Sequence, residues 1–413
     1  MSSAQVDLTM NIKRILLALL AIGSLGTLIL AIAYLVPLPI ATDRDFITLY
    51  HTNWTFVRGI DLYDYPNQLA LLQSELQITF PFHPYPYPPW FALTTFYLGW
   101  FPIEIAARIW FQLNLLMITA AVWLLTANWK PTSQLLALAA ALLFIPTLGH
   151  LVIGQSTAPI LLGMALFIWS ARARSAEGIA LAFGLMTFKP NLGIFPLLAF
   201  SGWLLFQRDK PFVRRTVIRI AIIAVFLFTA GFIADPAWPL TYIRGLGGWH
   251  EYPVAETCNL CASLTANLIQ AFQLEYSDRL GAIWGLILAM IIGVPLAWHY
   301  RRQAIQPELL AVLVTCLTLL AFPYLLNYDF MLLVAPMLIL AERLRLTKNQ
   351  RPETDASKFD RLGILLLAGA YFLPWGMIIW GQNGDLLLIG ATFLLLILAW
   401  RLDWNFTPYQ AQA

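Results

Sequence analysis

Near its start the chain reads ILLALLAIGSLGTLILAIAYLVP at 15–37 and, after four residues, TDRDFITLYHTNW at 42–54. The first run can cross a membrane, which needs about 20 apolar residues, and it exceeds the roughly 7–15 residues of a signal-peptide core. Lys13 and Arg14 precede it and no small-residue cleavage site follows, so we expect an uncleaved first span with a cytoplasmic N-terminus. The polar stretch continues to Pro89 with acids, aromatics and prolines, which favours a site over a spacer.

The composition is that of a membrane protein. Hydrophobic residues make up 60% of the chain and charged residues only 11%, whereas about a quarter of a soluble domain is charged. The net charge is +3 and the basic residues fall in short clusters. No basic stripe indicates nucleic acid, and membrane lipids are the expected surroundings. We predict an all-α polytopic membrane protein in which residues 1–413 form one domain.

Apolar stretches recur along the chain, and several exceed the length of one crossing. They lie near 88–127, 134–149, 152–171, 177–206, 215–234, 280–299, 308–342, 362–380 and 385–400. Prolines divide two of them, at Lys189-Pro190 and at Pro323, which predicts about 11 to 13 transmembrane helices. The stretch 88–127 suits either two crossings or one crossing plus a helix lying in the interface.

Basic clusters predict the orientation, because Lys and Arg are enriched in cytoplasmic loops. If those clusters are cytoplasmic, the segments on the other side are 42–89, 149–157, 235–278, 323–329 and 380–385. We therefore expect a multi-pass cell-membrane protein with an extracytoplasmic site, a partly helical first extracytoplasmic loop at 42–89 and a second large one at 235–278. The charged segment 341–361 is expected to be a solvated cytoplasmic linker.

Two acids in the first loop could carry chemistry. Asp43 and Asp45 follow the first span closely. Asp45 could cap a helix that begins at Phe46, since an aspartate accepts hydrogen bonds from free N-terminal amides. Alternatively, one of the two acids is a general base that takes a proton from an attacking hydroxyl. A pair of carboxylates is a weak signal for a metal site.

Short matches recur in a fixed order between residue 41 and about residue 330. They are Asp45-Phe46, Tyr50, Gly59, Leu62-Tyr63, Tyr87-Pro88-Pro89, Trp110, Asn114, Gly154-Gln155, Lys189-Pro190, and Asn259 with Ser263. The ordered set resembles glycosyltransferase family 87. These are membrane enzymes of the GT-C type that include polyprenyl-phosphate-mannose-dependent α-1,2-mannosyltransferases.

The resemblance implies a fold, a reaction and residue roles. It implies a GT-C-type bundle that transfers a hexose, expected to be mannose, from a polyprenyl-phosphate sugar donor to an extracytoplasmic lipid or glycan acceptor, with inversion and without a cofactor or metal. Asp45 takes the role of the catalytic base, and Asp43 is the second choice. Family members often have a histidine near the 327–329 position that contacts the reacting phosphate region. This chain has Asn327-Tyr328-Asp329 there and departs from the pattern.

Lys189 lies within an apolar stretch and precedes a proline. An intramembrane lysine is costly and indicates a functional site. We expect Lys189 to bind the donor phosphate. The alternatives are that it snorkels to the membrane boundary or pairs with Asp235 or Glu177. Arg108 and Arg244 are alternative phosphate ligands.

Further candidates for substrate binding lie in the segments expected on the extracytoplasmic side. They are Gln155, Asn259, His51, Tyr63, Tyr87, Asn327, Asp329 and His250. Structural roles remain open for several of them: Gln155 could cap a helix end, His51 could pack among aromatics, and Tyr87 lies in a proline-rich run that favours an extended entry to the next helix.

Cys258 and Cys261 form a Cys-x-x-Cys pair that could be a local disulfide or two free thiols, and they lack the further ligands of a zinc site. Two other function classes also remain. Proline-broken spans are typical of a transporter or lipid flippase, although no two related halves are visible. A non-catalytic family member that binds lipid carriers is the third interpretation.

Overall fold

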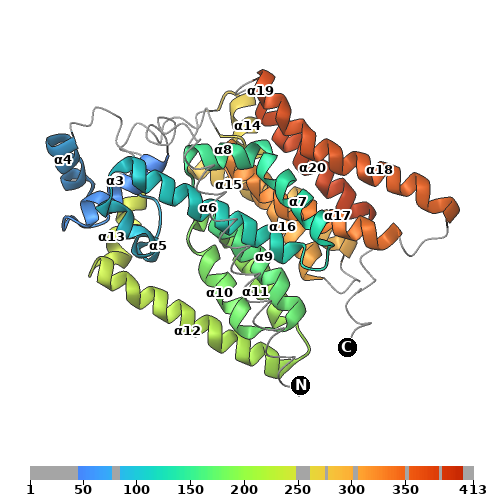
Figure 1. The fold of residues 1–413 in the computed structure, drawn as a ribbon, viewed down its shortest axis with the longest axis horizontal. Helices are drawn as coiled ribbons and strands as arrows, with labels where there is room; N and C mark the ends of the chain where they lie inside the picture. The colour runs from blue at the N-terminus through green and yellow to red at the C-terminus, as the bar shows by residue number, and fades with distance from the viewer. Residues whose placement is uncertain are drawn as a thin grey trace, which may run out of the picture.

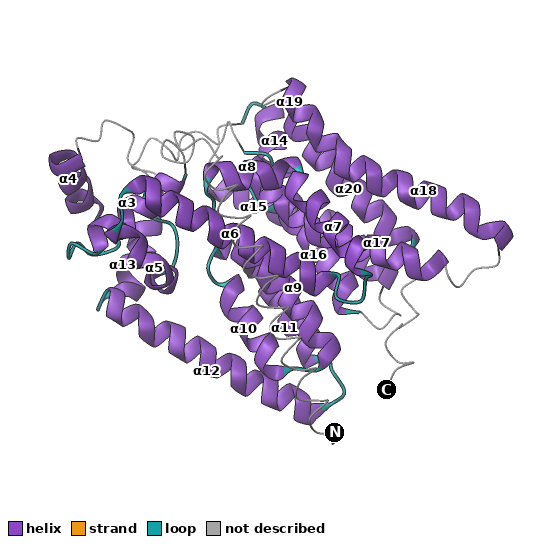
Figure 2. Cartoon of the chain, viewed as in Figure 1, coloured by secondary structure: helices purple, strands orange, loops and turns teal. Residues whose placement is uncertain are grey.

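The fold is helical throughout the part of the chain that the structure, a computed structural model, describes. The described residues are 45–76, 84–247, 261–274, 278–300, 306–348, 353–380 and 384–402. Within these ranges Figure 2 shows helices and loops and no strand. The β structure there is limited to one isolated antiparallel bridge between Cys261 and Leu326. The predicted all-α fold is confirmed.

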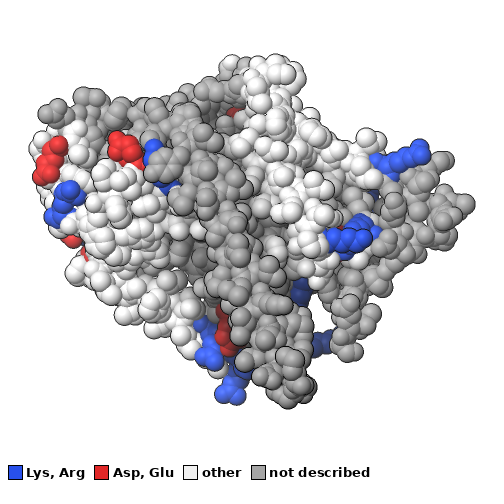
Figure 3. Space-filling model, viewed as in Figure 1, with Lys and Arg blue, Asp and Glu red and all other residues white. Residues whose placement is uncertain are grey.

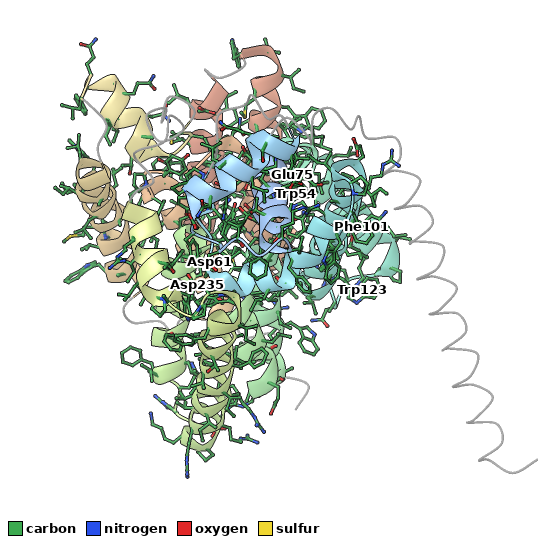
Figure 4. The ribbon with its side chains drawn as sticks, turned by 90° about the vertical axis from the view of Figure 1, so that its left-hand side faces the viewer. Trp54, Asp61, Glu75, Phe101, Trp123 and Asp235 are labelled. Atoms are coloured by element: carbon green, nitrogen blue, oxygen red, sulfur yellow. The ribbon has the colours of Figure 1, made fainter. Side chains whose placement is uncertain are left out.

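Short helices gather at one end of the molecule, on the left in Figure 1. They are α3 (Phe46–Phe56), α4 (Tyr65–Leu76), α5 (Pro89–Thr95), the 3-10 helix η1 (Phe96–Trp100) and α13 (Trp238–Gly247). Their shared core is aromatic and includes the buried side chains of Phe46, Trp54, Tyr85 and Phe91. Figure 4 faces this end, with α3 and α4 in front of the longer helices. The first loop is thus partly helical, as expected.

Helices from the middle of the chain form the centre and the lower edge in Figure 1. They are α6 (Ile103–Leu125), α7 (Pro131–Leu143), α8 (Ile145–Ile153), α9 (Ala158–Ala173), α10 (Ala176–Met186), α11 (Pro190–Leu205) and α12 (Lys210–Ala234). α12 exposes large apolar side chains such as Val225, Phe226 and Ile233. An apolar face of this kind fits contact with lipid rather than with water.

The C-terminal part packs against this bundle. Its elements are α14 (Leu264–Ala271), α15 (Asp278–Tyr300), α16 (Pro307–Ala321), the 3-10 helix η5 (Asn327–Leu333), α17 (Val334–Lys348), α18 (Glu353–Phe372), the 3-10 helix η6 (Leu373–Gly376), α19 (Met377–Trp380) and α20 (Asp385–Arg401). One large apolar core joins α6 through α11 to α16, α17 and α20. Much of 341–361, expected as an unfolded linker, is helical, because α17 continues to Lys348 and α18 begins at Glu353.

Four helical segments of the described chain are long and apolar enough to cross a membrane. They are Ile103–Leu125, Lys210–Ala234, Leu280–His299 and Arg361–Trp380, and α7 with α8, bent by 64°, would make a fifth. Shorter apolar helices are α9, α10, α11 and α16. Charged side chains are sparse on the face in Figure 3. A polytopic membrane protein is confirmed, whereas the count of about 11 to 13 transmembrane helices and the orientation stay predictions.

Prolines divide the chain where the sequence indicated. α10 ends at Met186 and α11 begins at Pro190, so Lys189 lies at a helix boundary. The later break falls between α16 and η5, around Pro323. The stretch 88–127 forms one crossing-length helix, α6, after the short helices α5 and η1. Only α6 in this stretch has the length of a crossing, which favours one crossing over two.

Candidate functional site

Asp45 directs its side chain away from the helix that follows it. It occupies the N-cap position of α3 with φ −62° and ψ −23°, and its carboxylate makes no capping hydrogen bond. Instead, Oδ2 accepts hydrogen bonds from Gln155 Nε2 and from the Tyr328 hydroxyl, the latter at 2.6 Å. The helix-cap interpretation of Asp45 is therefore wrong. The carboxylate is tied to two segments far away in the sequence.

Gln155 reaches Asp45 because the chain turns sharply at the end of α8. Gly154 adopts a left-handed conformation with φ +76°, and a Cβ at this position would lie 2.7 Å from the Phe46 Cβ. Glycine allows both the conformation and the close approach. The Trp110 indole donates a hydrogen bond of 2.8 Å to the Gly154 carbonyl. The turn therefore sets Gln155 beside the start of α3.

Lys189 is buried at the start of α11, with 7% of its side chain exposed. Its Nζ donates to Asp329 Oδ1 at 2.6 Å, to Thr157 Oγ1 at 3.1 Å and to Gln155 Oε1 at 3.2 Å. Asp329, rather than Asp235 or Glu177, is its ionic partner.

The two acids considered as alternative partners of Lys189 form other contacts. Asp235 accepts hydrogen bonds from the Ala237 backbone and from Thr241, and Glu177 pairs with Arg219. The alternative that Lys189 pairs with Asp235 or Glu177 is therefore wrong, because the acid that the fold brings to Lys189 is 140 positions away along the chain.

These contacts form one hydrogen-bond network, whose members are Asp45, Tyr328, Gln155, Lys189, Thr157 and Asp329. Asp329 makes two further contacts in it. Its Oδ1 also accepts from the Thr157 hydroxyl at 2.7 Å, and its Oδ2 accepts from the Leu326 backbone N–H at 3.3 Å. The second contact closes the first turn of η5. Asp329 thus contacts the Lys189 ammonium directly, whereas Asp45 is linked to it through the Gln155 amide.

Three helices begin at this network: α3 after Asp45, α9 after Thr157 and α11 after Lys189. The N-terminus of a helix carries a partial positive charge and free N–H groups. Their convergence offsets part of the negative charge of the two carboxylates, and it makes the site favourable for an anionic group.

Tyr87 is held beside the network by other tyrosines. Three successive carbonyls, of Tyr85, Pro86 and Tyr87, accept hydrogen bonds from the hydroxyls of Tyr65 at 3.0 Å, Tyr242 at 3.4 Å and Tyr63 at 2.9 Å, respectively. This set of contacts, the tyrosine clamp, fixes the extended run before α5.

Two hydroxyls of the tyrosine clamp, those of Tyr63 and Tyr242, stay protonated at neutral pH. Burial raises the pKa of Tyr242 to about 12 and raises that of Tyr63 further. Burial also raises the pKa of Tyr87, while the nearby Lys189 lowers it and Asp45 raises it. The Tyr87 hydroxyl therefore lies within electrostatic reach of the network.

The other predicted site residues are distributed more widely. His51 is buried on α3 with its ring centroid 6.2 Å from that of Tyr50. Asn327 is half-buried at the start of η5. Arg108 is half-buried on α6, and Arg244 is exposed on α13. Asp43, Asn259, His250 and Cys258 lie outside the described residues.

The segment after Asn259 nevertheless approaches the site. Ala262 N–H donates to the Leu325 carbonyl at 2.7 Å, two residues before η5 begins. The Ser263 hydroxyl caps α14 through Ala266 N–H and donates to the Pro323 carbonyl at 3.2 Å. Cys261 is disulfide-bonded, which favours the disulfide alternative over two free thiols, and Cys316 is a free buried thiol. The second large loop therefore joins the 323–329 segment.

Two members of the network were missed by the sequence reasoning. Tyr328 lies between the predicted residues Asn327 and Asp329, and Thr157 lies two positions after Gln155. Behind them, His150 Nε2 lies 3.0 Å from Asn114 Oδ1, and the Asn114 amide donates to the Trp110 carbonyl. The position of Tyr328 within a predicted site segment was an available signal. His150 and Thr157 also lie in a segment expected on the extracytoplasmic side, 149–157, and their position was the same kind of signal.

The molecule is a polytopic helical membrane protein whose charged network is buried where its first loop meets the bundle. The sequence model of glycosyltransferase family 87 matches residues 85–323, more than half of the chain, and the chain belongs to that family. It is a membrane glycosyltransferase. The match includes Tyr87, Gln155 and Lys189 and excludes Asp45 and Asp329. No curated protein matches the chain.

Proposed function

We propose that the protein transfers a hexose, expected to be mannose, from a polyprenyl-phosphate sugar to a hydroxyl of an extracytoplasmic lipid or glycan. The family supplies the class of reaction. The carboxylate of Asp45, held by Gln155 and Tyr328, is the observation that carries the proposed mechanism.

In this mechanism Asp45 is the general base. Both of its side-chain hydrogen bonds from described residues fall on Oδ2, which leaves Oδ1 to accept the proton of the acceptor hydroxyl. The acceptor oxygen forms a bond to the anomeric carbon while the bond from that carbon to the phosphate oxygen breaks. The proton passes to Asp45, and the phosphate leaves with the electron pair. A single displacement of this kind inverts the anomeric centre.

The leaving phosphate needs a favourable electrostatic environment. The starts of α3, α9 and α11 supply partial positive charge without reorganisation. The hydroxyls of Tyr87 and Tyr324 lie near the same acids, as their electrostatic coupling to Asp45 indicates. Direct phosphate binding by Lys189 stays a prediction.

The test is transfer by purified protein in proteoliposomes, supplied with polyprenyl-phosphate [³H]mannose and a membrane lipid extract as acceptor. We expect a labelled lipid or glycan product from the wild type. Removal of a general base typically lowers the rate about 10²–10⁴-fold, and we expect a loss of that size in Asp45→Asn. Asp61→Asn is the matched control, since Asp61 is exposed in the same loop (Figure 4). Equal turnover of Asp45→Asn and wild type would refute Asp45 as the base, and substrate flux without transfer would favour a transporter.

A further inference from the structure

The hydrogen-bonding capacity of Lys189 is fully used within the protein. A lysine ammonium has three N–H donors and no acceptor. Those donors meet one acceptor each, on Asp329, Thr157 and Gln155. A donor phosphate could bind Lys189 only by displacing one of these buried partners. Displacement of Asp329 would leave a carboxylate buried without its countercharge, which is unfavourable.

The hydrogen bond from Lys189 determines which way the Gln155 side-chain amide faces. An amide side chain has one acceptor end and one donor end, and the hydrogen-bond network decides which way it faces. Because Lys189 takes the Oε1 end, the Nε2 end faces Asp45 Oδ2 and the Tyr328 oxygen. The opposite orientation would place the amide oxygen against the Asp45 carboxylate, and the lysine against an NH₂ group.

We propose that Lys189, held by Asp329 and Thr157, is a positioning residue that fixes the Gln155 amide and, through it, the Asp45 carboxylate. This inference rests on the proposed function, because it assigns a role relative to the proposed base. It differs from the expectation that Lys189 binds the donor phosphate. The chain of contacts runs from Asp329 to Lys189, from Lys189 to Gln155, and from Gln155 to Asp45.

The two roles predict different kinetics. Loss of a phosphate ligand weakens binding of donor and of product. Loss of a positioning residue lowers kcat, because a reacting group misplaced by about 1 Å costs on the order of 10²-fold in rate, and it leaves lipid-phosphate binding intact.

The main variant is Lys189→Gln combined with Asp329→Asn, which removes both charges together and avoids an isolated buried charge. We expect kcat to fall about 10–100-fold, with the donor KM and the Kd for polyprenyl phosphate each within about threefold of the wild type. A Kd raised more than tenfold with little change in kcat would overturn the proposal and make Lys189 a phosphate ligand.

Lys189→Arg provides a second test in case the double variant does not fold. Arginine keeps the charge and the pair with Asp329, but its planar fork cannot reproduce the three contacts of the lysine. A positioning role predicts a clear loss of kcat in Lys189→Arg. A phosphate-binding role predicts that transfer is retained, which would count against the proposal.

Gln155→Met completes a double-mutant cycle. If Lys189 acts through Gln155, adding the Lys189→Gln/Asp329→Asn change to Gln155→Met lowers kcat little further, whereas additive losses would contradict the proposal. These outcomes are separable from the proposed function itself. Absence of transfer by the wild type refutes the transferase mechanism, whereas the kinetic split between variants concerns Lys189 alone.

Discussion

The hydroxyl of Tyr328 donates a hydrogen bond of 2.6 Å to Oδ2 of Asp45, although the two residues are 283 positions apart. This contact ties the start of α3 to η5. The same hydroxyl accepts from Gln155 Nε2 at 2.9 Å, so the three side chains form a closed triangle. The side chain of the proposed base is therefore already fixed in one orientation before substrate binds. This lowers the entropic part of the activation barrier.

Tyr328→Phe tests the triangle. The substitution removes the hydrogen bond to Asp45 and keeps the ring, whose centroid lies 5.6 Å from Lys189 Nζ. Hydrogen bonds to charged groups contribute about 1.5–3 kcal/mol, so we expect kcat to fall roughly 10–100-fold with a folded protein. Tyr97→Phe on η1 is the matched control, and steady-state transfer is the measurement. Unchanged kcat in Tyr328→Phe would show that the contact does not support catalysis.

Gly154→Ala tests the turn that presents Gln155. The new Cβ would meet Phe46 at 2.7 Å in a backbone conformation, φ +76°, that alanine disfavours. Such strain costs on the order of 1–3 kcal/mol, and the clash would displace α3 and Asp45. We expect a lower melting temperature and loss of most transfer activity.

Gly59→Ala shows what backbone strain does without a steric clash, and so serves as the control for Gly154→Ala. Gly59 also has positive φ, +86°, but a Cβ added there would meet no atom within 4 Å. We expect a modest loss of stability, about 1 kcal/mol, with transfer activity retained. Similar activity losses in both variants would show that the contact with Phe46 is not what matters at Gly154.

Tyr242→Phe tests the tyrosine clamp through pH. Burial raises the pKa of Tyr242 to about 12 from the ordinary value of 10.0. The unfolded chain therefore releases this proton at lower pH than the folded protein does. The stabilising effect is fully present below pH 10 and is lost as the pH rises towards 12. We expect the wild-type melting temperature to fall more steeply than that of Tyr242→Phe between pH 10 and about 12, the range set by these two values. Parallel curves would contradict a buried, protonated hydroxyl.

The sequence singled out four residues that meet in one hydrogen-bond network, but it did not predict the contacts between them. Asp45, Gln155, Lys189 and Asp329 were each identified from polarity or position in segments that the fold brings together. Their pairing could not be read from periodicity, because a hydrogen bond between residues more than a hundred positions apart leaves no local pattern. This is why the sequence offered Asp235 and Glu177, and not Asp329, as alternative ionic partners of Lys189.

The same distinction applies to the fold. Prolines and apolar length predicted the helical class and the breaks at Pro190 and Pro323. They did not predict that the segment 134–149 divides at Phe144, where α7 ends and α8 turns by 64°. A proline at the second position of α8 is compatible with either a continuing, kinked helix or a new one. Packing against η5 and the core determines which forms.

Glu308→Gln tests whether burial decides the strength of an ion pair in this bundle. Glu308 at the start of α16 pairs with Arg172 at the end of α9, with 2.6 Å between Arg172 Nε and Glu308 Oε1. The Arg172 side chain is 15% exposed and the Glu308 side chain is 11% exposed. Removing one acid of a largely buried pair is destabilising by up to about 3–5 kcal/mol, because the remaining charge loses an ionic contact. The Arg219–Glu177 pair is the natural comparison, since its side chains are 53% and 71% exposed, and such surface pairs contribute about 0–1 kcal/mol.

We expect Glu308→Gln to lower the melting temperature in detergent clearly and Glu177→Gln to leave it nearly unchanged. Transfer activity per folded molecule should be retained in both variants, because neither acid contacts the network around Asp45. Equal shifts in melting temperature would show that the pair between α9 and α16 is no stronger than one in water.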